Sequence, residues 1–118
     1  MAYQNFEDLE VWKRACAQSI AIYRLLEDWK RYSLKDQMER SGLSVPSNIA
    51  EGQERDSKGD FIRFLRIAKG SNGELRTQIH VATQLGFISP EKSRELLVES
   101  KEISAMLQGL IRAIESRL

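Results

Sequence analysis

The residues of this sequence best suited to bind a ligand are four cations that share a helical spacing. They are Arg63, Arg66, Lys69 and Arg76. At about 100° per residue, the first three step around one side of a helix, and Arg76 falls close to Lys69 in angle. Guanidinium and ammonium groups bind phosphate oxygens through charge and hydrogen bonds. This pattern therefore predicts a surface that binds RNA or DNA.

Two glycines, Gly70 and Gly73, lie on the same expected face and leave a shallow gap in its side-chain cover. Such a gap allows a phosphate backbone to approach, but it also allows a helix of a neighbouring subunit to pack there. A solvent-exposed face is the third interpretation. We expect no exposed aromatic residue between the cations, which argues against stacking of single-stranded bases. The sequence leaves these alternatives open.

The charge of the whole chain adds little, because the formal net charge is only +1. Its distribution is more informative. Residues 57–88 carry five cations against two carboxylates, a net +3, whereas residues 33–56 carry three against five, a net −2. The segments before and after them balance at zero. We therefore expect the basic surface within residues 57–88.

A second unusual stretch is S-V-P-S-N-I-A-E-G, Ser44–Gly52, which places a proline within a helical pattern. Proline in a helix removes a hydrogen bond and clashes with the carbonyl four residues earlier, at a cost of ~3 kcal/mol or more. That carbonyl belongs to Gly42, so we expect a kink near residues 42–46. The structural interpretation is a kink that allows close helix packing, and the functional one is a polar patch at an oligomer seam or channel wall. The residues of this predicted kink or oligomer region are Gly42, Pro46, Ser47, Asn48, Glu51, Gly52, Gly70 and Gly73.

Nothing in the sequence favours catalysis. The chain has one histidine, His80, and one cysteine, Cys16, and it has no phosphate-binding loop, HExxH or CxxC motif. Glu51 and Glu74 are a pair of carboxylates of a kind that any helical bundle offers. We therefore expect no catalytic residue, no metal and no cofactor, with Cys16 in the core and His80 at the surface.

Capping signals predict the helices on which these residues lie. Asn5, Ser33 and Ser57 each stand three residues before an aspartate, and Ser89 precedes a proline, which suits a helix start. Gly86 suits a helix end. The signals predict helices over about 6–30, 34–55, 58–85 and 90–117, with Glu51 paired to Arg55 within the second.

Apolar residues within three of these ranges recur at steps of three and four, the spacing of a bundle seam. Asn72 interrupts the seam of the third helix, and a buried asparagine there is expected to fix the register. The predicted fold is one domain over residues 1–118, an antiparallel up-down-up-down four-helix bundle with a proline kink in the second helix. The expected seams are Leu9, Trp12, Cys16, Ile20, Tyr23 and Leu26; Leu34, Met38, Val45 and Ile49; Phe61, Leu65, Ala68, Asn72, Leu75, Ile79 and Ala82; and Leu96, Ile103, Leu107, Leu110 and Ile114.

Composition places the 118 residues in an ordinary globular class, with 42% hydrophobic and 30% charged residues. No apolar run reaches the ~18 residues of a membrane span, and the N-terminus lacks the features of a signal peptide. A single cysteine gives no sign of an oxidising compartment. We expect a cytoplasmic protein with no membrane partner.

Several motifs together resemble one known family. Val11-Trp12-Lys13 in the first helix, Ser44–Gly52 in the second, Phe64–Ser71 and Glu74–Gln78 in the third are similar to motifs of the four-helix bundle proteins encoded in 23S rRNA intervening sequences. The resemblance covers nearly the whole chain. It departs from the family at Asn72-Gly73, where larger residues are common.

The resemblance implies a bacterial homo-oligomer, a pentamer around a central channel. It also implies kinship with the accessory proteins of diversity-generating retroelements, which bind nucleic acid and partner a reverse transcriptase. It implies no catalysis and supplies no binding residues. The predicted function is therefore non-catalytic binding of RNA or DNA by a homo-oligomer through Arg63, Arg66, Lys69 and Arg76. The alternative is a scaffold for a protein partner such as a reverse transcriptase, with no nucleic-acid affinity.

Overall fold

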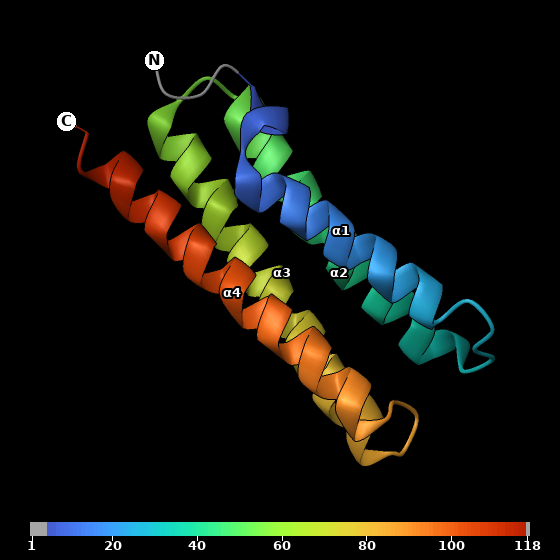
Figure 1. Ribbon diagram of the computed structural model, residues 1–118. Coiled ribbons are helices and arrows are strands. Elements are labelled where there is room, and N and C mark those ends of the chain that lie inside the picture. The colour runs from blue at the N-terminus through green and yellow to red at the C-terminus, as the bar shows by residue number, and fades with distance from the viewer. Residues whose placement is uncertain (1–4, 118) are drawn as a thin grey trace.

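The computed structural model describes residues 5–117 as a short 3-10 helix and four α-helices (Figure 1). The elements are η1 (Phe6–Asp8), α1 (Glu10–Leu25), α2 (Tyr32–Glu54), α3 (Lys58–Gln84) and α4 (Pro90–Glu115). Residues 5–117 contain no strand. The predicted all-α four-helix bundle is confirmed.

Short turns join the helices, so that each lies beside the one before it (Figure 1). α1 packs on α2, α2 on α3, α3 on α4, and α4 returns to α1. The bundle measures 48 × 20 × 19 Å, so its cross-section is nearly square. The four helices therefore surround a shared interior and form four long outer faces.

Two of the four predicted helix starts are confirmed. The Ser57 side chain accepts the Asp60 N–H at 3.3 Å, and the Ser89 side chain accepts the Lys92 N–H at 3.1 Å. The other two predictions are wrong. Asn5 precedes only the 3-10 helix and makes no capping bond, and Ser33 lies inside α2, which begins one residue earlier.

The turn after α3 shows why a glycine follows that helix. Gly86 has φ = +80°, a conformation that favours glycine. Its N–H bonds the Thr83 carbonyl, and the Phe87 N–H bonds the Ala82 carbonyl. These two hydrogen bonds end α3 and turn the chain toward α4.

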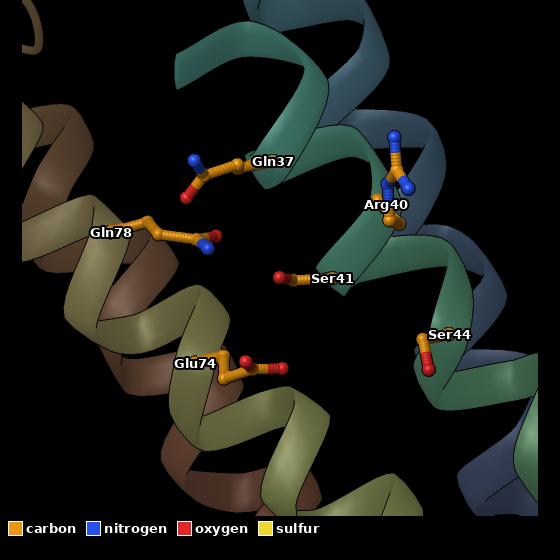
Figure 2. Close-up of a pocket in the computed structure, with 6 residues that line it drawn as sticks. All are labelled: Gln37, Arg40, Ser41, Ser44, Glu74 and Gln78. Atoms are coloured by element: carbon orange, nitrogen blue, oxygen red, sulfur yellow. The ribbon is translucent and has the colours of Figure 1, made fainter. Parts of the chain in front are cut away.

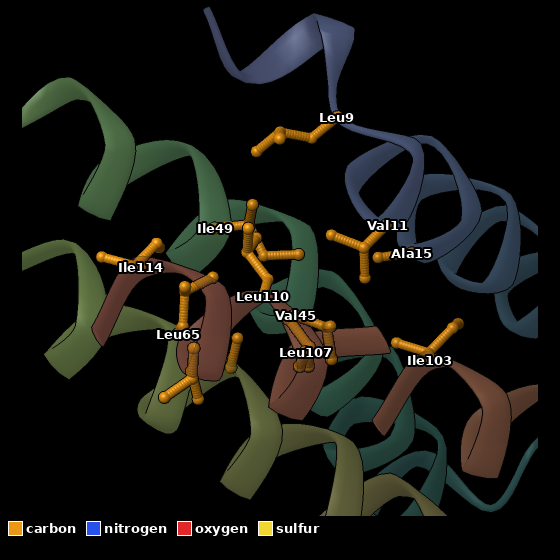
Figure 3. Packing of buried hydrophobic residues seen from close by; sticks show 12 residues of the cluster. Leu9, Val11, Ala15, Val45, Ile49, Leu65, Ile103, Leu107, Leu110 and Ile114 are labelled. Atoms are coloured by element: carbon orange, nitrogen blue, oxygen red, sulfur yellow. The ribbon is translucent and has the colours of Figure 1, made fainter. Parts of the chain in front are cut away.

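The predicted seams of α2, α3 and α4 are confirmed. Apart from the half-buried Leu34 and Phe61, every residue predicted for these seams is buried. Figure 3 shows residues from all four helices meeting in the larger of two apolar clusters. That cluster contains Leu9, Val11, Ala15, Val45, Ile49, Leu65, Ala68, Ile103, Leu107, Leu110, Ile111 and Ile114. The second contains Ile22, Leu26, Met38, Leu75, Ile79, Ala82, Ile88 and Leu96.

The predicted seam of α1 is wrong apart from its ends. Ile20 and Tyr23 are 51% and 42% exposed, and Trp12 and Cys16 are only half-buried. The buried face lies about 100° around the helix and consists of Val11, Ala15, Gln18, Ser19 and Ile22. α1 also ends at Leu25 and not at residue 30. This helix therefore keeps an apolar stripe on the outside.

A polar layer separates the two apolar clusters at the middle of the bundle. Gln18 Nε2 donates to Asn72 Oδ1 at 3.2 Å, and Asn72 Nδ2 donates to the Ser100 carbonyl at 2.7 Å. Ser100 Oγ also donates to Asn72 Oδ1, at 3.1 Å. Asn72 is completely buried. The layer therefore links α1, α3 and α4 at one level.

α2 is continuous from Tyr32 to Glu54, with Pro46 buried inside it. The helix is thus not broken at proline, and the kink at residues 42–46 stays a prediction. Asn48 Nδ2 donates to the carbonyl and the hydroxyl of Ser44, both at 2.8 Å. Ser44 Oγ in turn lies 2.8 Å from Ser71 Oγ on α3.

Candidate nucleic-acid interface

Arg63 and Arg66, the first two predicted ligand residues, lie exposed near the start of α3. Arg63 forms an ion pair with Asp60 at 3.7 Å, and its guanidinium lies 4.6 Å from the centre of the Phe64 ring. Arg66 pairs with Glu115 of α4 at 3.0 Å. Their side chains remain 56% and 59% exposed, so both guanidinium groups can reach a ligand.

Lys69 and Arg76 have a different environment, because both contact α4. Lys69 Nζ donates to Gln108 Oε1 at 2.8 Å, and Arg76 Nη1 donates to Ser100 Oγ at 3.1 Å. Both side chains are half-buried. Arg76 thereby extends the polar layer of Asn72 and Ser100. The four predicted residues do not form one free face, because these two line the seam between α3 and α4.

Gly70 and Gly73 do leave open surface between these cations. A Cβ added at either position would meet no atom within 4 Å. Gly109 on α4 is equally open. Since Lys69 and Arg76 bond Gln108 and Ser100, residues 69–76 run alongside residues 100–108. The outer face of the α3–α4 hairpin therefore has low side-chain cover at its centre.

The carboxylates of α4 are nearly all engaged in ion pairs. Glu95 pairs with Lys92 at 3.5 Å, and Glu115 pairs with Arg66. Glu99 and Glu102 both bind Arg14 of α1, at 2.5 Å each. These hydrogen bonds raise the pKa of the Arg14 guanidinium further above its already high ordinary value. Beyond the first turn, α4 therefore offers no free carboxylate.

Three cations of α4 take part in none of these ion pairs. Within residues 5–117, the side chains of Arg94, Lys101 and Arg112 have no hydrogen bond or ion pair. They follow one another at intervals of seven and eleven residues, so they share one side of the helix, and all three are exposed. The stripe spans roughly 27 Å at ~1.5 Å per residue. It is the strongest unneutralised positive feature on α4.

Sequence reasoning missed this stripe because it summed charges by segment. Residues 89–118 hold five cations and five carboxylates, so their net charge is zero. The carboxylates Glu95, Glu99 and Glu102 lie on the side of α4 toward α1, whereas the stripe faces outward. The spacing of Arg94, Lys101 and Arg112 was the signal that could have revealed it.

The Ser44–Gly52 segment lies against α3, and its last residue explains part of its pattern. A Cβ at Gly52 would stand 2.6 Å from Phe64 Cβ, so only glycine fits without moving a helix. The predicted pair of Glu51 with Arg55 is confirmed, at 3.1 Å. Ser47 is exposed, as is Glu51. The segment thus combines close helix packing with an outward polar side.

The groups considered for chemistry do not assemble into a reactive site. In the described part of the chain, no three side chains of His, Cys, Asp or Glu cluster to hold a metal. His80 is exposed, as predicted. Cys16 is half-buried, which corrects the prediction of a core position, and burial raises the pKa of its thiol. None of the helices within residues 5–117 is long and apolar enough to cross a membrane.

Comparisons with known proteins agree with the fold and with the motifs. No curated protein matches the sequence. A crystal structure from Bacteroides thetaiotaomicron, described as a protein with unknown function from the S23 ribosomal protein family, is similar with a TM-score of 0.81. It is 27% identical, and the match covers 86% of this chain and 97% of that one. That description specifies no catalytic activity.

The family comparison covers most of the sequence. The model of the 23S rRNA-intervening sequence protein family matches residues 7–109. This range contains all the motifs on which the resemblance was based. The chain therefore belongs to the 23S rRNA-intervening sequence protein family.

Proposed function

We propose that this protein is a non-catalytic homo-oligomer that binds RNA or DNA phosphates through the outer face of its α3–α4 hairpin. This phosphate face comprises Arg94, Lys101 and Arg112 of α4 with Arg63 and Arg66 of α3. Arg66 joins the two sets, because its partner Glu115 lies one helical turn beyond Arg112.

The observation that supports the proposal is that the carboxylates of α4 beyond its first turn are ion-paired whereas its outward cations are not. Glu95, Glu99, Glu102 and Glu115 are all ion-paired, while the three outward cations are not. Unpaired exposed cations attract phosphates with a strength that depends on salt, because binding releases counterions. The open surface at Gly70 and Gly73 allows a sugar–phosphate backbone to lie close to the helices. Repetition of the face in an oligomer would add avidity.

The test is fluorescence anisotropy of nuclease-treated protein with labelled structured RNA and duplex DNA at several salt concentrations. Binding should weaken linearly in log salt. The triple variant R94Q/K101Q/R112Q should bind much more weakly. The slope of its log affinity against log salt should be smaller by about 2 to 3, since each phosphate contact contributes ~0.7 to 0.9 to that slope. R63Q/R66Q should reduce the slope by less than about 2.

A matched control separates this surface from general charge. K13Q/R24Q/K30Q removes three exposed charges that are unpaired within residues 5–117 from α1 and the turn after it, and should leave binding nearly unchanged. An equal loss of affinity in the two triple variants would show that no particular face is used. Absence of binding even at low salt would leave the alternative, an adaptor for a protein such as a reverse transcriptase.

A further inference from the structure

A groove between α2 and α3 contains polar groups that the fold leaves without partners. Two adjoining depressions, of about 370 and 390 Å³, make up this α2–α3 groove. No residue of the phosphate face lines either depression, so the groove is a separate surface. Its central residues are Leu34, Gln37 and Ser41 of α2 with Glu74, Gln78 and Val81 of α3.

The register of α2 and α3 sets these residues opposite one another in pairs. The Ser44 and Ser71 hydroxyls lie 2.8 Å apart and close one end of the groove. From this contact, each step of three or four residues back along α2 matches an equal step forward along α3, because the turn at residues 55–57 joins the two helices. Within residues 5–117, no hydrogen bond or ion pair joins the members of the next three pairs. These pairs are Ser41 with Glu74, Gln37 with Gln78, and Leu34 with Val81.

Three oxygen atoms in the groove can accept hydrogen bonds and have no donor among residues 5–117. Ser41 is only 7% exposed, and its hydroxyl has no partner there. Gln78 Oε1 is buried without a partner, and the Glu74 carboxylate forms no ion pair. Figure 2 shows Glu74 and Gln78 projecting from α3 toward α2, and Ser41 projecting from α2 toward them. The groove therefore favours a ligand that supplies several donors at one point.

A primary ammonium group has the matching chemistry. It carries three N–H donors and no acceptor, and its hydrogen bonds to a carboxylate are strengthened by charge. The far end of the groove is apolar, with Leu34 half-buried and Val81 46% exposed. This end lies seven residues from the Ser41–Glu74 level, roughly 10 Å at ~1.5 Å per residue, so an aliphatic chain of about five or six carbons reaches it.

The charges around the groove also favour a cation. Glu74 and Arg40 are the charged residues that line it. Arg40 stands at the rim on α2 and leans away from α3 (Figure 2), toward a neighbouring depression that Asp36 and Glu39 also line. None of these four residues forms an ion pair within residues 5–117. Three carboxylates thus surround a single cation, and the local charge is negative.

We propose that the α2–α3 groove binds a small molecule that carries a primary ammonium group on an aliphatic chain. The ammonium donates to Gln78 Oε1, to the Glu74 carboxylate and to the Ser41 hydroxyl. The aliphatic chain lies along Leu34 and Val81. This site is additional to the proposed function, because it shares no residue with the phosphate face. Simple amines and α-amino acids both offer this chemistry.

Nuclear magnetic resonance of isotope-labelled protein, titrated with pentylamine, tests the proposal. The side-chain amide signals of Gln37 and Gln78 should shift and saturate, with a dissociation constant of about 1 mM or lower. Pentanol has the same chain without the ammonium and should bind about tenfold or more weakly. Equal affinity for the two compounds, or no saturable shift with pentylamine, would overturn the proposal.

Arg40 distinguishes the two sources of the ammonium group. Norleucine is pentylamine with a carboxylate on the carbon that bears the amine, and this carboxylate can pair with Arg40 at the rim. If the natural ligand is an amino acid, norleucine should bind more tightly than pentylamine, and Arg40→Gln should remove the difference. If it is a simple amine, pentylamine should bind more tightly, and Arg40→Gln should strengthen its binding because a nearby like charge is lost.

Substitutions within the groove locate the site. Glu74→Gln should weaken pentylamine binding about tenfold or more, and Ser41→Ala about threefold or more. Glu74 is exposed, so its substitution should leave the fold intact, which circular dichroism checks. Glu39→Gln is the matched control, because it removes the same charge outside the groove, and it should change the affinity less than about twofold.

Equal losses in Glu74→Gln and Glu39→Gln would show only general attraction of a cation and would overturn the proposed site. The phosphate-face variant R94Q/K101Q/R112Q should bind pentylamine as the wild type does. Glu74→Gln should in turn retain nucleic-acid binding. Failure of the amine site and failure of the proposed function are therefore distinguishable.

Discussion

Asn72 shows how one polar side chain can determine the alignment of a bundle. It lies between two apolar clusters and joins Gln18 of α1 to Ser100 of α4. A shift of α3 by seven residues would preserve its apolar seam but would move this carboxamide into an apolar cluster. Its hydrogen bonds would then be lost, at about 1 to 3 kcal/mol for each buried group left without a partner. Only one register satisfies the polar layer.

We therefore expect Asn72→Ala to lower the free energy of unfolding by about 2 to 4 kcal/mol, because the Gln18 amide and Ser100 lose their partner. Urea denaturation followed by circular dichroism measures this. Asn48→Ala is the matched control, since Asn48 is half-exposed and bonds only Ser44, and it should cost less than about 1 kcal/mol. Equal effects of the two substitutions would show that the buried polar layer contributes no more to stability than the half-exposed hydrogen bonds of Asn48.

At the scale of the helices, the two glycines of α2 differ in how closely neighbouring helices approach them. At Gly52 an added Cβ would stand 2.6 Å from Phe64 Cβ and 3.3 Å from Phe61 Cδ1. At Gly42 the nearest atoms, from Leu75 and Ser19, are 3.8 Å away, which is ordinary contact. α2 and α3 thus approach most closely at the end of the Ser44–Gly52 segment.

The predicted consequence is a contrast between two identical substitutions. Gly52→Ala should destabilise the fold by about 1 to 3 kcal/mol through overpacking. Gly42→Ala should be neutral or stabilising by up to about 1 kcal/mol, because alanine favours the helix. Thermal unfolding of both variants measures the contrast. A Gly52→Ala protein as stable as the wild type would mean that α2 and α3 separate at little cost.

The helices also show where sequence reasoning succeeds. In α3 and α4 the apolar residues at steps of three and four are the buried ones, so this spacing identifies the buried faces of both helices. α1 has two stripes, and the more hydrophobic one, with Ile20 and Tyr23, faces outward. Its buried face carries Ala15, Gln18 and Ser19, because it borders the polar layer. Hydrophobicity alone selects the wrong stripe where small and polar residues are buried and large hydrophobic ones are exposed.

The candidate site was less predictable than the fold, for a reason that concerns pairs of helices. Arg76 is a cation of α3 in the sequence, but in the bundle it bonds Ser100 and belongs to the seam with α4. In the sequence of α4, carboxylates balance the charges of Arg94, Lys101 and Arg112. In the bundle, Arg14 of α1 binds Glu99 and Glu102, so these two carboxylates no longer neutralise the cations of α4. Which charges remain free depends on contacts between helices that no single segment reveals.

For the whole molecule, α1 is the helix held least firmly. Among its buried residues Ala15, Gln18 and Ser19 are small or polar, and it meets α4 through the ion pairs of Arg14, which are partly exposed. Salt weakens such pairs. α3 by contrast buries Phe64, Leu65, Leu75 and Ile79 and contacts both α2 and α4. Local opening should therefore begin at α1.

Hydrogen exchange measured by mass spectrometry should show this order. At low protein concentration, amides of α1 should exchange about tenfold or more faster than those of α3, and Arg14→Gln should widen the gap. Arg55→Gln, which removes another exposed ion pair, should not. Simultaneous exchange of α1 and α3 would contradict the order.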